Sequence, residues 1–156
     1  MVLLYSEICL IAEAGDLMEQ RRVELNGKSY PPKRILVCGP RKWPRELSFW
    51  VFMVVGGLKK KYGDDIVIIE GEAPGVDTFA REAAEALGLE VDPYPANWKF
   101  GKSAGPIRNT QMLDEGKPDR VTAIGYGSGT NNMVNQSRER GVFIEWRYKE
   151  VSWLES

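Results

Sequence analysis

The sequence of 156 residues contains no histidine and only two cysteines. Without histidine, the chain cannot form a histidine-based catalytic triad, use a histidine as general base or build a histidine-ligated metal site. Cys9 and Cys38 are too few for a disulfide framework or a four-thiolate zinc site, and they are typical of a protein from a reducing compartment. We therefore expect a cytoplasmic protein with no metal and no cofactor.

Long apolar runs and an excess of basic charge are also missing. The longest apolar run, Leu47 to Leu58, is shorter than the roughly 20 residues that span a bilayer. The first residues lack a basic segment, and Glu7 interrupts their apolar stretch, so we expect neither a signal peptide nor a membrane segment. With 21 basic and 22 acidic residues the net charge is −1, which disfavours binding to duplex DNA.

The length and the hydrophobic content of 43% suit one domain with its own core. We predict an N-terminal extension over residues 1–33 and an α/β domain over residues 34–156. In the extension, the pattern predicts a helix over 5–22, followed by a hairpin whose turn is Asn26-Gly27.

From residue 34 onward, short apolar runs alternate with helical patterns. The predicted strands are 34–38, 66–70, 89–95, 121–125 and 142–146, and the predicted helices are 45–62, 76–88, 105–115 and 130–140. The clearest helix, 76–88, places Val76, Phe79, Ala80, Ala83, Ala84 and Leu87 on one face. This alternation predicts an open parallel sheet of about five strands with helices on both faces.

The predicted helix 45–62 carries two apolar stripes. The first stripe consists of Leu47, Trp50, Val51, Val54 and Leu58 and is expected to cover the sheet. The second stripe, Phe49, Phe52 and Val55, would be exposed in a monomer. Since large exposed apolar patches are usually covered, either the N-terminal extension or a second subunit packs there. We predict a homodimer through this helix.

Candidate ligand-binding residues follow the predicted strands, where open α/β sheets bind their ligands. The segments concerned are rich in glycine and proline and comprise residues 39–44, 71–77, 96–108 and 126–130. The last contains Gly127 and Gly129, which allow close backbone approach, and Thr130, which is able to cap the next helix. That helix has no carboxylate in its first turn, so its positive end suits a phosphate, although an ordinary capped turn has the same sequence.

Arg108 and Asn109 fall in the first turn of the helix that begins near Gly105-Pro106. A cation at this end opposes the helix dipole unless an anion lies nearby. That anion is either a ligand phosphate or a surface carboxylate such as Glu72. We favour the phosphate.

Five further residues in or next to these segments are candidates for the site. Arg41 is a phosphate ligand or a solvated side chain, and Trp98 stacks on a base or packs in a loop. Asp77 binds ribose hydroxyls or complements the helix dipole. Glu70 and Glu72 are, besides Asp77, the nearby carboxylates able to act as general acid or base.

The glycine-rich segments form an ordered set of motifs. They run from Gly39-x-Arg41 through Gly71-x-Ala73-x-Gly75-Val76-Asp77 and Pro95-Ala96-x-Trp98 to Gly105-Pro106-x-Arg108-Asn109 and Gly127-x-Gly129-Thr130. Together these motifs resemble the SLOG superfamily, in particular its YspA-like branch, a domain of unknown function from bacteria and phages. The resemblance implies a Rossmann-like domain that binds a nucleotide or a nucleotide-derived ligand. It implies ligand contacts at Gly39, Arg41, Gly71, Asp77, Arg108, Asn109, Gly129 and Thr130, to which the residue patterns add Gly75, Trp98 and Gly127.

Relatives of this branch include DprA-type DNA-processing proteins and the lonely-guy phosphoribohydrolases. The phosphoribohydrolases carry a glutamate three residues after the threonine of the glycine loop, where this chain has Met133. Three functions follow: nucleotide binding with hydrolysis of an N-glycosidic or phosphate bond, a non-catalytic nucleotide sensor that acts through a protein partner, and single-stranded DNA binding like that of DprA. For the hydrolase, Asp77, Glu70 and Glu72 are the predicted catalytic residues.

Overall fold

Five parallel strands form the central sheet of the computed structural model, which describes residues 23–25 and 28–151. The strands are β3 (Arg34–Cys38), β4 (Val67–Glu70), β5 (Glu90–Pro93), β6 (Arg120–Ile124) and β7 (Phe143–Arg147). The helices are α3 (Ser48–Tyr62), α4 (Val76–Ala86), α5 (Ala104–Asp114) and α6 (Ser128–Glu139), with 3-10 segments at Arg45–Leu47 and Trp98–Ser103. The predicted Rossmann-like fold with five parallel strands is confirmed.

The strand order is β5-β4-β3-β6-β7, so the chain reverses its direction of travel across the sheet at β3. The three central strands are almost completely buried, whereas the edge strands β5 and β7 are partly exposed. This is the difference expected between strands covered on both faces and strands at a sheet edge. In such sheets, the crevice between the two strands where the order reverses is the usual ligand site.

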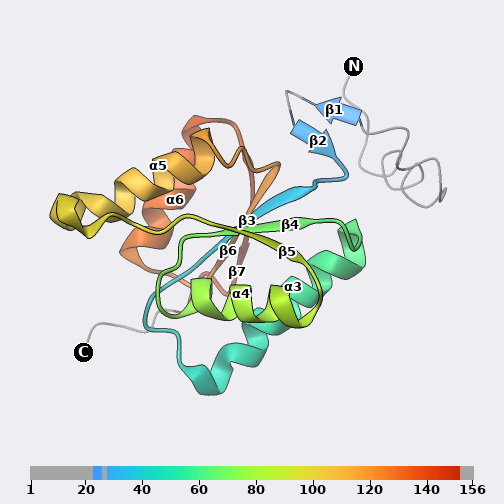
Figure 1. The fold of residues 1–156 in the computed structure, drawn as a ribbon, viewed down its shortest axis with the longest axis horizontal. Coiled ribbons are helices and arrows are strands. Elements are labelled where there is room, and N and C mark those ends of the chain that lie inside the picture. Colours follow the sequence, from blue (N-terminus) through green and yellow to red (C-terminus); the bar gives the residue numbers. More distant parts are fainter. Residues whose placement is uncertain (1–22, 26–27, 152–156) are drawn as a thin grey trace.

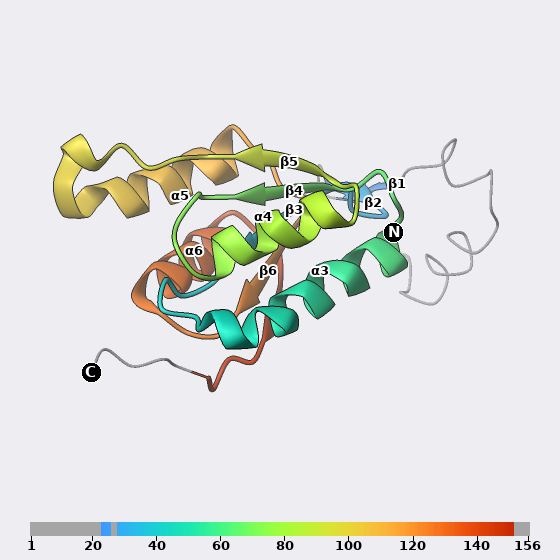
Figure 2. The ribbon, with the colours of Figure 1, turned by 60° about the horizontal axis from the view of Figure 1, so that its bottom comes forward.

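Helices cover both faces of the sheet. Figures 1 and 2 show α3 and α4 on one side and α5 and α6 on the other. The apolar face predicted for α4 is confirmed, since Val76, Phe79 and Ala80 all lie in the core beneath α3 and α4. A second core, which includes Met112 and Met133, lies beneath α5 and α6.

The predicted second stripe of α3 is wrong at one position. Val55 is fully buried in the core, because α4 packs closely along α3 and extends the covered face of that helix. Phe49 and Phe52 are exposed, as expected, and Met53 joins them with 65% of its surface accessible. The dimer through this helix stays a prediction.

A short hairpin of β1 (Val23–Leu25) and β2 (Lys28–Tyr30) precedes the main domain. Its strands pair antiparallel, as the sequence predicted, while the predicted helix 5–22 and the Asn26-Gly27 turn lie outside the described residues. The Asp119 carboxylate accepts hydrogen bonds from the backbone N–H groups of Ser29, Lys33 and Arg34 and thereby fastens this segment to the amino end of β6. The domain boundary at residue 33 stays a prediction.

Within the described ranges, no helix is long and apolar enough to cross a membrane.

Candidate functional site

The carboxyl ends of the strands bring the predicted segments together at one edge of the sheet. β3 leads into the loop with Gly39 and Arg41, β4 into residues 71–75, and β6 into the start of α6. In Figure 2 the arrowheads of β4 and β5 point toward the loops that precede α4 and α5. The edge therefore combines three helix starts with the loop after β3, which is the geometry of a ligand site in an open α/β sheet.

Close backbone contact explains two of the glycines at this edge. A Cβ atom on Gly71 would lie 2.7 Å from Arg108 Cζ and 2.9 Å from Asp77 Oδ2, so a side chain there would displace the guanidinium. Gly39 is enclosed in the same way, because its Cβ would lie 2.6 Å from the carbonyl oxygen of Ile124 and from the Val76 side chain. Glycine at both positions therefore allows the backbone after β3 and β4 to pass in direct contact with residues of β6, α4 and α5.

Gly75 has a positive φ of 79° and passes against the backbone carbonyls of Pro40 and Arg41. Only glycine adopts this conformation without strain, and any Cβ would collide with those carbonyls. The Val76 N–H donates to the Pro40 carbonyl oxygen at 3.2 Å. The loop after β3 is therefore fixed to the start of α4.

Asp77 lies buried in the first turn of α4, and its carboxylate organises the loop that precedes the helix. Its Oδ2 accepts hydrogen bonds from the backbone N–H groups of Gly71 at 3.1 Å and Ala73 at 3.3 Å. Burial raises the pKa of Asp77 to about 6, against the lowering effect of Arg108 and of these two bonds. The carboxylate thus has a structural role in addition to any contact with a ligand.

Arg108, in the first turn of α5, reaches across to β4. Its guanidinium Nη1 donates to the Gly71 carbonyl oxygen, and its Nε donates to Asn109 Oδ1 at 3.2 Å. Glu72 does not partner it, because Glu72 lies 3.7 Å from Arg81 on α4. In the part of the chain that the structure describes, Arg108 forms no ion pair with a carboxylate, although it acts electrostatically on Asp77.

Asn109 joins the starts of α5 and α6. Its buried side-chain amide donates to the Gly129 carbonyl oxygen at 3.3 Å and to Asn132 Oδ1 at 3.0 Å. The guanidinium of Arg108 and the first turn of α6 are consequently held as one unit. Asn109 is therefore a positioning residue in this geometry.

The start of α6 differs from its expected form. The helix begins at Ser128 with Gly127 as its N-cap, so Thr130 lies inside the first turn and does not cap the helix. No side chain caps this end, and no acidic residue occupies the first turn. Thr130 is buried, and its hydroxyl has no hydrogen-bond partner within the described residues.

Arg41 and Trp98 meet above this edge. The Arg41 guanidinium lies 4.9 Å from the centre of the Trp98 ring, which is a cation–π arrangement. Arg41 is exposed, and Trp98 has 54% of its surface accessible. Neither side chain is packed in the core, so both are accessible to a ligand.

Glu70 points away from the Arg108 side of the sheet. Its Oε2 accepts a hydrogen bond from the Glu72 N–H at 2.5 Å, and its Oε1 lies 3.9 Å from Arg81 Nη1 on α4. The side chain is fully buried, and burial raises its pKa to about 7. Glu72 is less enclosed and has a positive φ of 54°. Of the three predicted catalytic carboxylates, Glu70 and Asp77 are buried and Glu72 is exposed.

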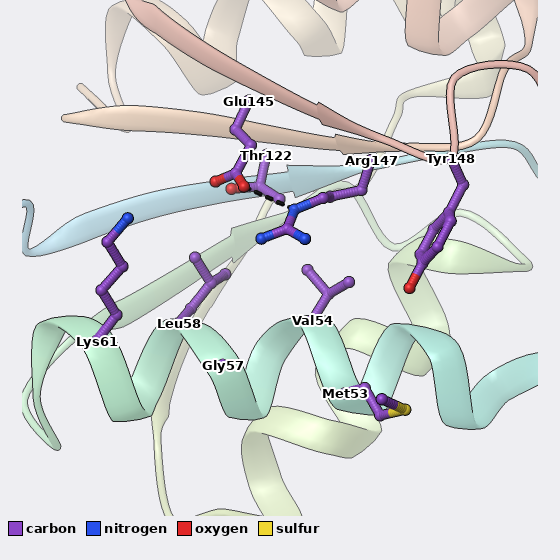
Figure 3. Close-up of a pocket in the computed structure, with 9 residues that line it drawn as sticks. All are labelled: Met53, Val54, Gly57, Leu58, Lys61, Thr122, Glu145, Arg147 and Tyr148. Carbon is purple, nitrogen blue, oxygen red and sulfur yellow. Dashed lines mark hydrogen bonds and ion pairs between the residues drawn. The ribbon is translucent and has the colours of Figure 1, made fainter.

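A pocket of about 180 Å³ lies elsewhere, between α3 and the strands β6 and β7. Figure 3 shows its lining, which includes none of the predicted site residues. Sequence reasoning missed it, although Thr122 and Glu145 are polar residues within predicted buried strands. Such interruptions are the signal that could have indicated a special environment. No group of three or more potential metal ligands occurs among residues 23–25 and 28–151.

Comparison with known proteins agrees with the predicted resemblance. Residues 33–101 match the sequence model of the YspA, cpYpsA-related SLOG family. No protein with a curated description matches the chain significantly. The family predicted from the motifs is thereby confirmed for the region that holds Gly39, Arg41, Gly71, Asp77 and Trp98.

A solved structure, that of DNA processing protein A (DprA) from Streptococcus pneumoniae, shares the fold with a TM-score of 0.59. The two sequences are 19% identical, and the similarity covers 72% of this chain and 49% of the DprA chain. The chain therefore spans about half the length of DprA. Identity at this level shows the fold alone.

Proposed function

We propose that this protein, whose residues 33–101 match the YspA, cpYpsA-related SLOG family, binds a nucleotide or a nucleotide-derived ligand. The ligand would occupy the carboxyl edge of the sheet, with its phosphate between Arg108 and the start of α6. The observation that carries this proposal is a guanidinium linked through Asn109 to a helix start that has no acidic residue in its first turn. A helix start with free N–H groups attracts anions, and the added guanidinium favours a phosphate.

The remaining residues of the edge have complementary roles in this proposal. The Thr130 hydroxyl, which lacks a partner among the described residues, would donate to a phosphate oxygen. The exposed ring of Trp98 would stack on a nucleobase, and Asp77, in the first turn of α4, would bind ribose hydroxyls. Gly39, Gly71, Gly75, Gly127 and Gly129 allow the backbone to approach such a ligand closely.

Thermal unfolding with a panel of AMP, ADP-ribose, NAD and cyclic nucleotides tests the proposal. A ligand at about 100 times its Kd stabilises the folded state by about 2.7 kcal/mol, which corresponds to a Tm increase of roughly 5–10 °C. Arg108→Ala should remove that increase. Arg138→Ala, at an exposed position near the other end of α6, is the matched control and should keep it. An equal ligand-induced increase in both variants would contradict the proposal.

Ligand hydrolysis is a separate question from binding. Met133, at the position of the phosphoribohydrolase glutamate, is fully buried beneath α6, and Glu70 is bonded within its own loop. These observations favour a non-catalytic sensor over N-glycosidic hydrolysis. Prolonged incubation with the bound nucleotide separates the two, because a sensor returns it intact. If product forms, Asp77→Asn and Glu72→Gln should slow it, and unchanged turnover would exclude both carboxylates.

Single-stranded nucleic acid is the second candidate ligand, favoured by exposed rings in the 3-10 segment. Trp98 and Phe100 have 54% and 56% of their surfaces accessible, and Lys99 and Lys102 accompany them. Bases stack on such rings, and DprA, which shares the fold, is a DNA-processing protein. The affinity for a labelled oligonucleotide, measured by fluorescence anisotropy, should then fall as the salt concentration rises. Trp98→Ala should also lower this affinity. A salt-independent affinity would exclude contact with the phosphate backbone.

A further inference from the structure

The pocket between α3 and β7 has one apolar wall and one polar wall. Met53, Val54 and Leu58 of α3 form the apolar wall, and Thr122, Glu145 and Arg147 of the sheet form the polar wall. Figure 3 shows the Arg147 guanidinium directed from β7 toward the helix. The pocket shares no residue with the proposed nucleotide site, so it is an independent feature of the fold.

The polar wall contains a hydroxyl that the described residues leave without a partner. Thr122 is fully buried and lines the pocket, yet its Oγ1 forms no hydrogen bond in the described part of the chain. The Arg120 Nε, two residues earlier on the same face of β6, is also buried and without a partner there. Buried polar atoms in folded proteins are nearly always bonded, so the Thr122 hydroxyl is the group of this wall that a polar ligand atom would satisfy.

The charges around the pocket favour an anion. The Glu145 carboxylate accepts hydrogen bonds from both Arg120 and Arg147, so two guanidinium groups face one carboxylate. Burial opposes the ionised form of Glu145, but the two arginines outweigh this effect and lower its pKa. A negatively charged group would therefore balance the excess.

The volume limits the size of the ligand. A cavity of about 150 Å³ is known to hold benzene, so about 180 Å³ accommodates a compact body of that size with one polar group. We propose that the α3–β7 pocket binds a small organic carboxylate. Its carboxylate contacts Arg147 and the Thr122 hydroxyl, and its apolar body packs against Met53, Val54 and Leu58.

Benzoate and isovalerate are the probes, with benzyl alcohol and isovaleramide as uncharged counterparts. Titration followed by NMR chemical shifts should give at least tenfold tighter binding for the carboxylates. Arg147→Gln should remove this preference and leave the weak binding of the alcohol unchanged. Equal affinity for charged and uncharged probes, or no binding at millimolar concentration, would overturn the proposal.

Adjacent glycines in α3 provide a matched pair of variants. Gly57 lines the pocket, and a Cβ there meets no atom within 4 Å, so Gly57→Met fills the space without displacing the protein. Gly56 faces Leu87, and its Cβ would be in ordinary contact at 4.0 Å, so Gly56→Met is the control outside the pocket. Benzoate binding should be lost in Gly57→Met and kept in Gly56→Met. Binding that survives in both would place the probe elsewhere.

Thr122→Val tests the unpartnered hydroxyl directly. Without ligand, the variant should unfold at a higher temperature than the parent, and its affinity for benzoate should fall several-fold. A lower unfolding temperature would mean that the hydroxyl has another partner and would contradict the proposal.

Sedimentation of the Gly57→Met variant gives one more decisive outcome. A dimer that dissociates only in Gly57→Met would assign the pocket to a subunit interface.

Discussion

Two helices, α4 and α6, start at the same edge of the sheet, but only one of them has an acidic residue in its first turn. Both follow a glycine N-cap just beyond a central strand, Gly75 before α4 and Gly127 before α6. The first turn of α4 contains Asp77, whose carboxylate bonds to the loop N–H groups. The first turn of α6 contains no acidic residue and receives no side-chain cap.

The difference shows which helix start is complete within the chain. At α4 the negative charge that favours a helix start comes from the protein itself. At α6 it does not, and the cation Arg108 is linked to this helix start through Asn109. We propose that the positive end of α6 accepts an external anion, whereas the start of α4 is completed by its own carboxylate. Four changes test this contrast.

Removal of the carboxylate at α4 should have the largest effect on folding. Asp77→Ala leaves the buried N–H groups of Gly71 and Ala73 without an acceptor, which should cost roughly 2–5 kcal/mol of unfolding free energy. Asp77→Asn keeps an acceptor oxygen and should lose less than half of that. Urea unfolding measures both. A stable Asp77→Ala protein would mean that α4 does not depend on its carboxylate.

Glu70, at the end of the strand before α4, should make stability depend on pH. Its pKa is raised from 4.5 to about 7 in the folded protein, so the folded state holds a proton that the unfolded chain releases earlier. The resulting stability is present below pH 4.5 and is lost as the pH rises through 7, by roughly 2–4 kcal/mol.

In Glu70→Gln the unfolding free energy should depend less on pH. At pH 8 this variant should therefore be more stable than the parent protein by roughly 2 kcal/mol. Urea unfolding at pH 5, 6, 7 and 8 provides the measurement. The raised pKa of Asp77, about 6, should leave a smaller residual slope in the variant. Parallel curves for the two proteins would show that Glu70 is ionised in the folded state without cost.

A carboxylate introduced into the first turn of α6 should stabilise the free protein and weaken the binding of an anion at this helix start. Ser128 is exposed in the first turn, and Ser128→Asp should stabilise the free protein by about 0.3–1 kcal/mol. The same change should weaken nucleotide binding at least tenfold, about 1.4 kcal/mol. Calorimetric titration compares it with Ser128→Asn, which adds no charge and should bind normally. Unchanged affinity would exclude this helix start as the phosphate site.

The smallest effect is expected at Thr130. Thr130→Val removes a buried hydroxyl without a partner among the described residues, so the free protein should keep or gain up to about 1 kcal/mol. Nucleotide affinity should fall several-fold. Thr110 is the matched threonine, because its hydroxyl has two acceptors within reach, the Pro106 carbonyl oxygen at 3.1 Å and Gln136 Oε1 at 2.8 Å. Thr110→Val should destabilise the protein, and a similar loss at Thr130 would reveal an internal partner.

Local sequence patterns determined the fold and the location of the candidate site. The apolar face of α4 has helical spacing, and the runs 34–38 and 121–125 have the composition of strands buried on both faces, so both could be predicted from neighbours in the chain. The glycines at 39, 71 and 75 follow strand ends, where parallel topology brings loops together. None of these inferences depends on which side chains from distant parts of the chain contact each other in the folded protein.

Contacts between distant residues decided the rest. Val55 is buried because α4 packs against α3, and Glu70 turns under α4 toward Arg81, which lies eleven positions later. Thr122 belongs to a pocket whose other wall comes from α3, more than sixty residues earlier in the sequence. Periodicity records whether a position is buried, but the partner and the charge that a side chain meets depend on packing between elements. The sequence therefore determined the sheet and the edge that carries the candidate site, and only the tertiary structure decided which polar groups are satisfied.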